Sequence, residues 1–169
     1  MQSQLPQPTD PVTVDLCALR ADPAGWNGKR IKVEGFVQQT FEQFTIAAEC
    51  RRATPAARVW LTYGGRVPSG TIYCCPGESD TAERPTPLTI DGIVLPLVRD
   101  ETFERFRKAL TQKRPALAHA VLVGTFFVGE NADVSGAEWG GFGHMGCCSL
   151  LVIERVQEFS LRKVPLKAP

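Results

Sequence analysis

The side chains best suited to chemistry lie near the C-terminal end of the chain, in the glycine-rich stretch GFGHMGCCSLLVIERV. This stretch places His144 just before the adjacent Cys147 and Cys148. A thiolate can act as a nucleophile or a metal ligand, and an imidazole can act as a general base or a metal ligand. With Cys74 and Cys75, these residues form a candidate metal- or thiol-dependent site.

The spacing of these residues does not favour catalysis or zinc binding. A structural zinc site commonly takes its ligands from two pairs of closely spaced residues. Cys74 and Cys75 are adjacent, which is too close for such a pair, and the two-residue spacing before Cys147 leads to His144 and not to a second cysteine. The chain also lacks GxSxG, HExxH and P-loop motifs. We therefore expect no metal and no cofactor, and favour a non-enzymatic role. We favour a structural interpretation of His144, in which Gly143 and Gly146 permit a tight turn with positive φ angles before a last strand and the imidazole hydrogen-bonds a neighbouring backbone group.

The six cysteines suit an oxidising compartment, where disulfides persist. We expect at least one disulfide, joining the 74/75 pair to the 147/148 pair, with Cys50 as the other possible partner. Cys17 is expected to be a small buried side chain on a short helix. If the last strand begins at Cys147, the adjacent Cys147 and Cys148 point to opposite faces. The disulfide candidates are Cys50, Cys74, Cys75, Cys147 and Cys148.

A second candidate site combines aromatic rings with basic side chains. Its residues are Phe44, Arg51, Arg52, Arg58, Trp60 and Arg66, with Tyr63 also available. Rings flanked by cations can stack the bases of single-stranded nucleic acid, or can recognise a protein or peptide. The formal net charge is only +1, so no overall field attracts polyanions. We therefore expect a protein or peptide partner, and single-stranded nucleic acid remains the alternative.

Period-two alternation of apolar residues predicts three consecutive strands in the first half of the chain. They cover the run from Ile31 to Gly35, residues 44–48, and residues 57–65, and the first two pair as a hairpin. Ahead of them, Asp15 can cap a short helix that carries Leu16, Cys17 and Leu19.

The second half begins with a long insertion loop, residues 66–88, and two extended pieces in 89–98 around an Asp-Gly turn. An amphipathic helix capped by Asp100 follows, with Phe103, Phe106 and Leu110 on one face. The remaining elements are a strand over 116–130, a glycine-rich loop over 131–146 and a closing strand over 147–161.

This order predicts a mainly β protein, a five-stranded OB-like Greek-key barrel with one helix between strands three and four. A short N-terminal helix and the long insertion loop complete it. Residues 13–162 are expected to form one domain, between a flexible tail at 1–12 and a C-terminal tail at 163–169.

The opening segment LCALRADPAGWNGKRIKVEGFV resembles that of a group of small, largely uncharacterised bacterial proteins with an OB-like barrel. The positions that carry this resemblance are Pro23, Trp26, Gly28, Lys29, Ile31, Val33, Gly35, Phe41 and Glu42. The runs GTFFVG and GFGHMG are similar to Gly-Phe and Gly-His-Gly elements of the same group, although two cysteines stand where apolar residues are expected. The resemblance covers about 22–48 and 118–156, and it implies the fold and no reaction.

The location of the protein is open at this stage. The N-terminal run MQSQLPQPTDPVTV lacks the basic start and apolar core of a signal peptide. The longest apolar stretches are about half the roughly 20 residues that span a bilayer, so a soluble protein is expected. Because of the cysteine content, we favour an exported protein whose signal peptide has been removed. A cytoplasmic protein is the alternative.

Overall fold

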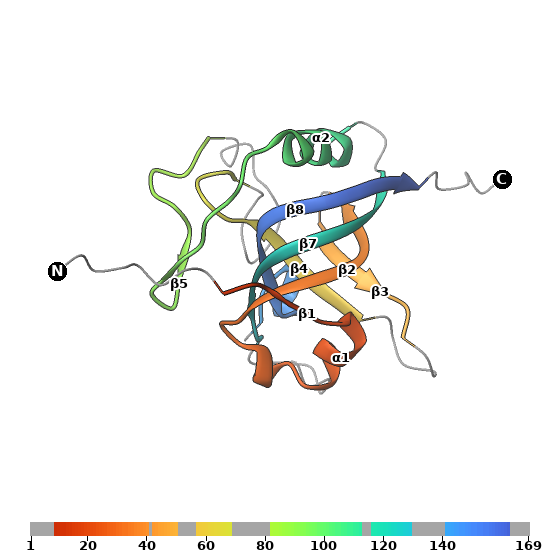
Figure 1. Cartoon of the computed structure of the whole chain (residues 1–169), viewed down its shortest axis with the longest axis vertical. Coiled ribbons are helices and arrows are strands. Elements are labelled where there is room, and N and C mark those ends of the chain that lie inside the picture. The colour runs from red at the N-terminus through yellow and green to blue at the C-terminus, as the bar shows by residue number, and fades with distance from the viewer. Residues whose placement is uncertain are drawn as a thin grey trace.

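The computed structural model describes residues 9–40, 42–50, 57–68, 82–112, 116–129 and 141–162. Five strands form a closed barrel in the order β2-β3-β4-β8-β7, in which β7 pairs again with β2 (Figure 1). The strands are β2 (Arg30–Gln39), β3 (Phe44–Ala48), β4 (Ala57–Tyr63), β7 (Leu117–Phe127) and β8 (Leu150–Arg162). All neighbours are antiparallel except β4 and β8, which are parallel. The predicted OB-like five-stranded barrel is therefore confirmed.

The interior of the barrel follows from the alternation in the sequence. In β2, Ile31, Val33 and Val37 are buried while Glu34 and Phe36 are exposed, because successive side chains point to opposite faces of a strand. A sixth strand, β1 (Val12–Thr13), pairs in parallel with the first residues of β2. It covers a part of β2 that the β3 register, which begins at Phe36, leaves unpaired.

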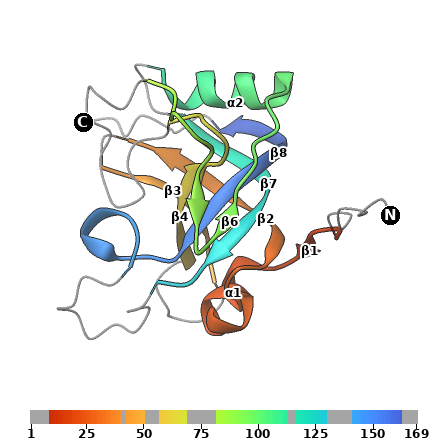
Figure 2. The same ribbon diagram turned by 90° about the vertical axis from the view of Figure 1, so that its left-hand side faces the viewer.

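The two helices lie at opposite ends of the barrel (Figures 1 and 2). Helix α1 (Leu16–Ala21) buries Leu16 and Leu19, and the Asp15 carboxylate caps it by accepting hydrogen bonds from two backbone N–H groups. A Cβ at Gly35 would lie 2.8 Å from Leu16 Cδ1 and 2.7 Å from a backbone carbonyl, so only glycine lets α1 approach the sheet this closely.

Helix α2 (Glu101–Leu110) joins the third and fourth barrel strands and covers the other end. The Asp100 side chain accepts a hydrogen bond from the Phe103 N–H at 2.9 Å, as expected of an N-cap residue. Phe103 and Phe106 are fully buried, and Phe103 packs edge-on against Tyr63 at 5.2 Å between ring centroids. Burial raises the pKa of Tyr63, so its phenol stays neutral. The predicted amphipathic helix is confirmed, with Phe103, Phe106 and Leu110 buried on one face.

The insertion between β4 and α2 packs on the outside of the barrel. It contains the hairpin of β5 (Thr89–Ile90) and β6 (Ile93–Val94), as the Asp-Gly turn predicts (Figure 2). The Arg84 guanidinium donates hydrogen bonds to the carbonyls of Tyr63, Gly65 and Val67, which fastens the insertion to the end of β4. Residues 69–81 of the expected insertion loop lie outside the described residues.

A second hydrophobic cluster forms beneath this insertion, separate from the barrel interior. Trp60 from β4 packs there with Leu95, and Phe127, Leu150 and Val152 complete the cluster. Both faces of β4 are thus covered, since Leu61 and Tyr63 belong to the core inside the barrel. The second cluster decides which of the candidate binding residues reach the surface.

Candidate functional site

The aromatic members of the predicted binding cluster are buried. Phe44 is 3% exposed and lies in the barrel core with its ring centroid 5.3 Å from that of Tyr63. Trp60 is 5% exposed and lies in the second cluster. Their ring faces are covered by other side chains, so neither ring presents a surface on which a base or a partner side chain could stack.

The basic members of the cluster divide into two groups. Arg58 and Arg66 are exposed, and the Arg66 Nε donates a hydrogen bond to the Arg84 carbonyl at 2.7 Å. Arg51 and Arg52 lie outside the described residues. Within the described part of the chain, the cluster therefore contributes two surface cations, Arg58 on β4 and Arg66 in the turn that follows it, with no exposed ring of the cluster between them.

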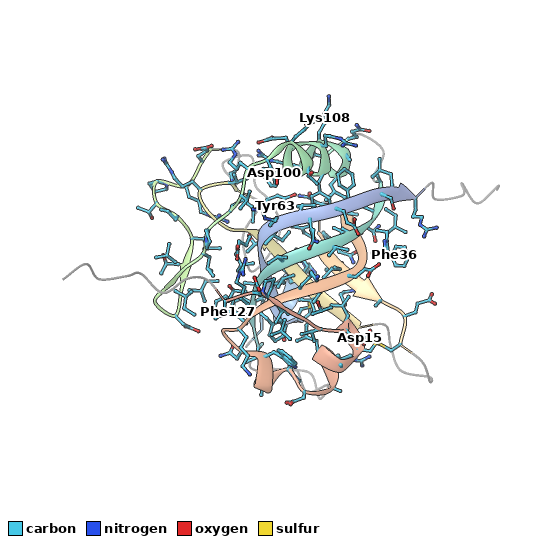
Figure 3. The ribbon with its side chains drawn as sticks, in the orientation of Figure 1. Asp15, Phe36, Tyr63, Asp100, Lys108 and Phe127 are labelled. Carbon is cyan, nitrogen blue, oxygen red and sulfur yellow. A yellow bond between two sulfur atoms is a disulfide. The ribbon has the colours of Figure 1, made fainter. Side chains whose placement is uncertain are left out.

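A different surface, on the outer face of the β2-β7-β8 sheet, combines an exposed ring with charges. Phe36 on β2 pairs in register with His119 on β7, which pairs with Ser160 on β8. The Phe36 side chain is 36% exposed, and its ring meets the imidazole edge-on at 5.2 Å between centroids. Figure 3 shows Phe36 at the side of the barrel where β8 ends.

Opposite charges lie on either side of this ring. His119 Nε2 is 3.2 Å from Glu34 Oε1, and the Arg162 guanidinium carbon lies 6.0 Å from the centre of the Phe36 ring. No carboxylate among the described residues forms an ion pair with Arg162. We call Glu34, Phe36, His119 and Arg162 the Phe36 patch.

The opposite face of β8 near its end carries a separate set of side chains, because Leu161 and Phe159 pair with the core residues Ala118 and Ala120 and so do not share the face of Phe36. Leu161, which precedes Arg162, is 52% exposed. Phe159 is half-buried against Phe106 of α2, and the Arg105 guanidinium lies 5.8 Å from the Phe159 ring centre. Exposed aromatic and arginine side chains are the types enriched in protein interfaces, so Phe36 and Arg162 give the Phe36 patch the composition of a recognition surface.

Sequence reasoning missed the Phe36 patch, although one local signal was present. The alternation of β2 assigns Phe36 to the same outer face as Lys32 and Glu34, and a phenylalanine on a polar face is an unusual choice. His119 and Arg162 could not be added from the sequence, because their positions beside Phe36 depend on the strand register.

The described cysteines form two disulfides, and both differ from the expected pairing. Cys50 is disulfide-bonded, but to Cys17 of α1, across 33 positions of the sequence. The expectation that Cys17 is an unpaired core residue is therefore wrong, although the bridge does pack against the barrel core. Cys147 and Cys148 are bonded to each other, which excludes the expected link from this pair to Cys74 or Cys75. Cys74 and Cys75 themselves lie outside the described residues.

The stretch around His144 is a turn that closes before the last strand begins. Strand β8 starts at Leu150, so the expectation that the cysteines begin this strand is wrong. Phe142 and Cys148 instead exchange two backbone hydrogen bonds, of 2.8 and 3.0 Å, and His144 starts the short 3-10 helix between them. The predicted positive φ angles are confirmed, at 79° for Gly143 and 65° for Gly146. Within the described residues, no group of three or more potential ligands could hold a metal ion.

Comparisons with models of protein families, with curated proteins and with solved structures find no match to this chain. None of the helices described above is long and apolar enough to cross a membrane.

Proposed function

We propose that this protein is a non-enzymatic OB-like binding module that recognises a protein or peptide through the Phe36 patch. The observation that carries the proposal is the exposed Phe36 ring with the Arg162 guanidinium beside it, on the outer face of the sheet. The proposal includes membership of the bacterial OB-like group that the N-terminal motif resembles.

The chemistry of the patch favours a ligand that carries both an apolar side chain and a carboxylate. Burial of the exposed part of Phe36 by a ligand would contribute favourable hydrophobic free energy to binding. The backbone would lose no conformational entropy, because β2 is already paired on both sides at this residue. The Arg162 guanidinium can donate two parallel hydrogen bonds to a carboxylate. A C-terminal residue or an acidic side chain next to an apolar one would satisfy both groups.

Single-stranded nucleic acid fits this surface less well than a peptide does. Glu34 and Glu158 lie on opposite sides of Val121 in one row of the sheet, next to the row that contains Phe36. Carboxylates so placed repel phosphates, whose neutralisation by cations supplies most of the affinity for nucleic acid. The described aromatic rings that could have stacked bases, Phe44 and Trp60, are buried.

The test is a selection of displayed random peptides on the folded protein, followed by affinity measurements on the selected peptides. Phe36→Ala and Arg162→Ala should each weaken binding at least tenfold, which is about 1.4 kcal/mol and typical of an interface hot spot. The matched control is Val94→Ala, since Val94 is 62% exposed on the β5–β6 hairpin, and this change should leave affinity unaltered.

Two outcomes would overturn the proposal. One is a set of selected peptides whose affinity is unaffected by either patch substitution. The other is tight binding of a labelled single strand that weakens steeply with salt, which would establish nucleic acid as the ligand.

The Cys17–Cys50 disulfide supports the further proposal that the protein works in an oxidising compartment outside the cytoplasm. Alkylation of the protein in its native host, before any lysis step that exposes thiols to air, should leave Cys17 and Cys50 unlabelled. Labelling of both cysteines in that experiment would contradict export.

A further inference from the structure

The disulfide between Cys147 and Cys148 contributes little to holding the fold together. It joins neighbouring residues, so it closes the shortest possible loop and removes almost no freedom from the unfolded chain. The Cys17–Cys50 bridge spans 33 positions, so it removes much more conformational freedom from the unfolded chain. Because the Cys147–Cys148 bond adds little to stability, a chemical role for it is worth considering.

The two sulfur-bearing residues of this pair differ in accessibility. Cys147 is exposed, whereas Cys148 is half-buried and packs against the second hydrophobic cluster. A thiolate in solution can therefore approach Cys147 more easily, and Cys148 is placed as the leaving group. Adjacent Cα atoms are about 3.8 Å apart across a peptide bond, below the 4.4 to 6.8 Å usual for disulfides, and bridges outside the usual geometry are more easily reduced.

The turn that carries the pair is built closely around it. A Cβ on Gly129 would lie 2.7 Å from the Cys148 carbonyl oxygen, and a Cβ on Gly143 would collide with the Trp60 ring. The Gly143 φ angle of 79° also favours glycine. The turn that carries the disulfide therefore packs against the Trp60 ring through Gly143, and Cys148 packs against the same cluster, so we expect opening of the bond to change the surroundings of the indole.

We infer that Cys147–Cys148 is a thiol–disulfide exchange site whose co-reactant is a small or protein dithiol. One thiolate of the dithiol attacks Cys147 Sγ, the Cys147–Cys148 bond breaks, and Cys148 leaves as a thiolate that takes up a proton. The second thiolate of the co-reactant then displaces Cys147 from the mixed disulfide. The protein gains two electrons and two protons, and the co-reactant becomes a disulfide.

Opening of the bond changes the surface of the second cluster. Phe142 and Cys148 are held together by their backbone hydrogen bonds, and Phe142 packs against the same cluster as Trp60. Reduction removes the covalent constraint on the turn that covers the indole, while the Cys17–Cys50 bridge keeps α1 attached to the barrel. The site is thus separate from the Phe36 patch and does not depend on the function proposed for it.

The test titrates the whole wild-type protein with dithiothreitol under native conditions, followed by acid quenching, alkylation and peptide mass spectrometry. Cys147 and Cys148 should become labelled at a dithiothreitol concentration at least tenfold lower than Cys17 and Cys50 do. In two-dimensional NMR the Trp60 indole N–H signal should shift over the same concentration range and return on reoxidation.

The Trp26 indole signal, which comes from a ring packed against the barrel core cluster and not against the second cluster, serves as the internal control and should stay in place. The Cys147→Ser/Cys148→Ser variant should show the shifted Trp60 signal without reductant, and dithiothreitol should not move it further. Reduction of Cys17–Cys50 at the same or lower concentration, or an unshifted Trp60 signal after complete reduction of Cys147–Cys148, would overturn the inference.

Discussion

The Cys17–Cys50 disulfide should account for a large part of the stability of the barrel, and the Cys17→Ser/Cys50→Ser variant tests this. The bridge closes a loop across 33 positions. The chain-entropy relation assigns such a loop a stabilisation of about 4 kcal/mol at 25 °C, because the unfolded chain loses conformational freedom. Typical domains are stable by only 5–15 kcal/mol, so the variant should lose a large fraction of its free energy of unfolding.

Equilibrium unfolding in urea, followed by far-ultraviolet circular dichroism, measures this loss. With a slope of about 2 kcal/mol per molar urea, the midpoint should fall by about 2 M. The matched control is Cys147→Ser/Cys148→Ser, which also removes one bridge and two sulfur atoms but opens a loop between neighbours. Its midpoint should fall by no more than about 0.5 M, because the loop entropy involved is small.

Two results would refute the reasoning. If the Cys17→Ser/Cys50→Ser variant loses less than about 1 kcal/mol of its free energy of unfolding, the closed loop does not stabilise the fold through the entropy of the unfolded chain. Equal losses in both variants would mean that loop length does not govern the effect. Hydrogen exchange adds a local measurement, since amides of α1 should lose more protection than those of β8 when the tether between Cys17 and Cys50 is removed.

Three smaller changes test other parts of the fold by the same urea assay. Gly35→Ala should cost about 2 kcal/mol, because the added methyl group meets Leu16 and a backbone carbonyl, and an unchanged midpoint would contradict the close approach of α1. Asp100→Ala should cost about 1 kcal/mol through loss of the α2 cap, and a cost near zero would mean that water replaces the cap fully. Glu154→Gln should cost about 1 to 2 kcal/mol, since Arg30 loses a two-bond ion pair of 2.6 and 2.7 Å between β2 and β8; no loss would show that solvent screens it.

Local features of the sequence predicted the elements of the fold and their order. Asp15 and Asp100 cap the helices that follow them, and the alternation of β2 assigns Val33 to the core and Glu34 to the surface. These predictions succeed because capping and strand periodicity depend on residues within a few positions of one another. The order of three strands, a helix and two strands then restricts the topology to few possibilities, of which the OB-like barrel is one.

The residues that face one another across the fold could not be predicted in this way. The sequence makes Trp60 and Phe44 equally good candidates for a binding face, but the insertion covers the outer side of β4 and buries Trp60. It also gives no reason to pair Cys17 with Cys50, because the distance between two Cα atoms depends on how α1 docks against β3.

The sequence by itself thus determined the five barrel strands except for the start of β8, the two helices with their caps, and the glycine-dependent turn before the last strand; it did not predict β1. Only the tertiary structure decided which ring stays at the surface, which cysteines meet and which charges flank Phe36. The physical reason is that burial and side-chain contact are set by strand register and by the docking of distant segments, and a shift of one residue in register would turn Phe36 inward.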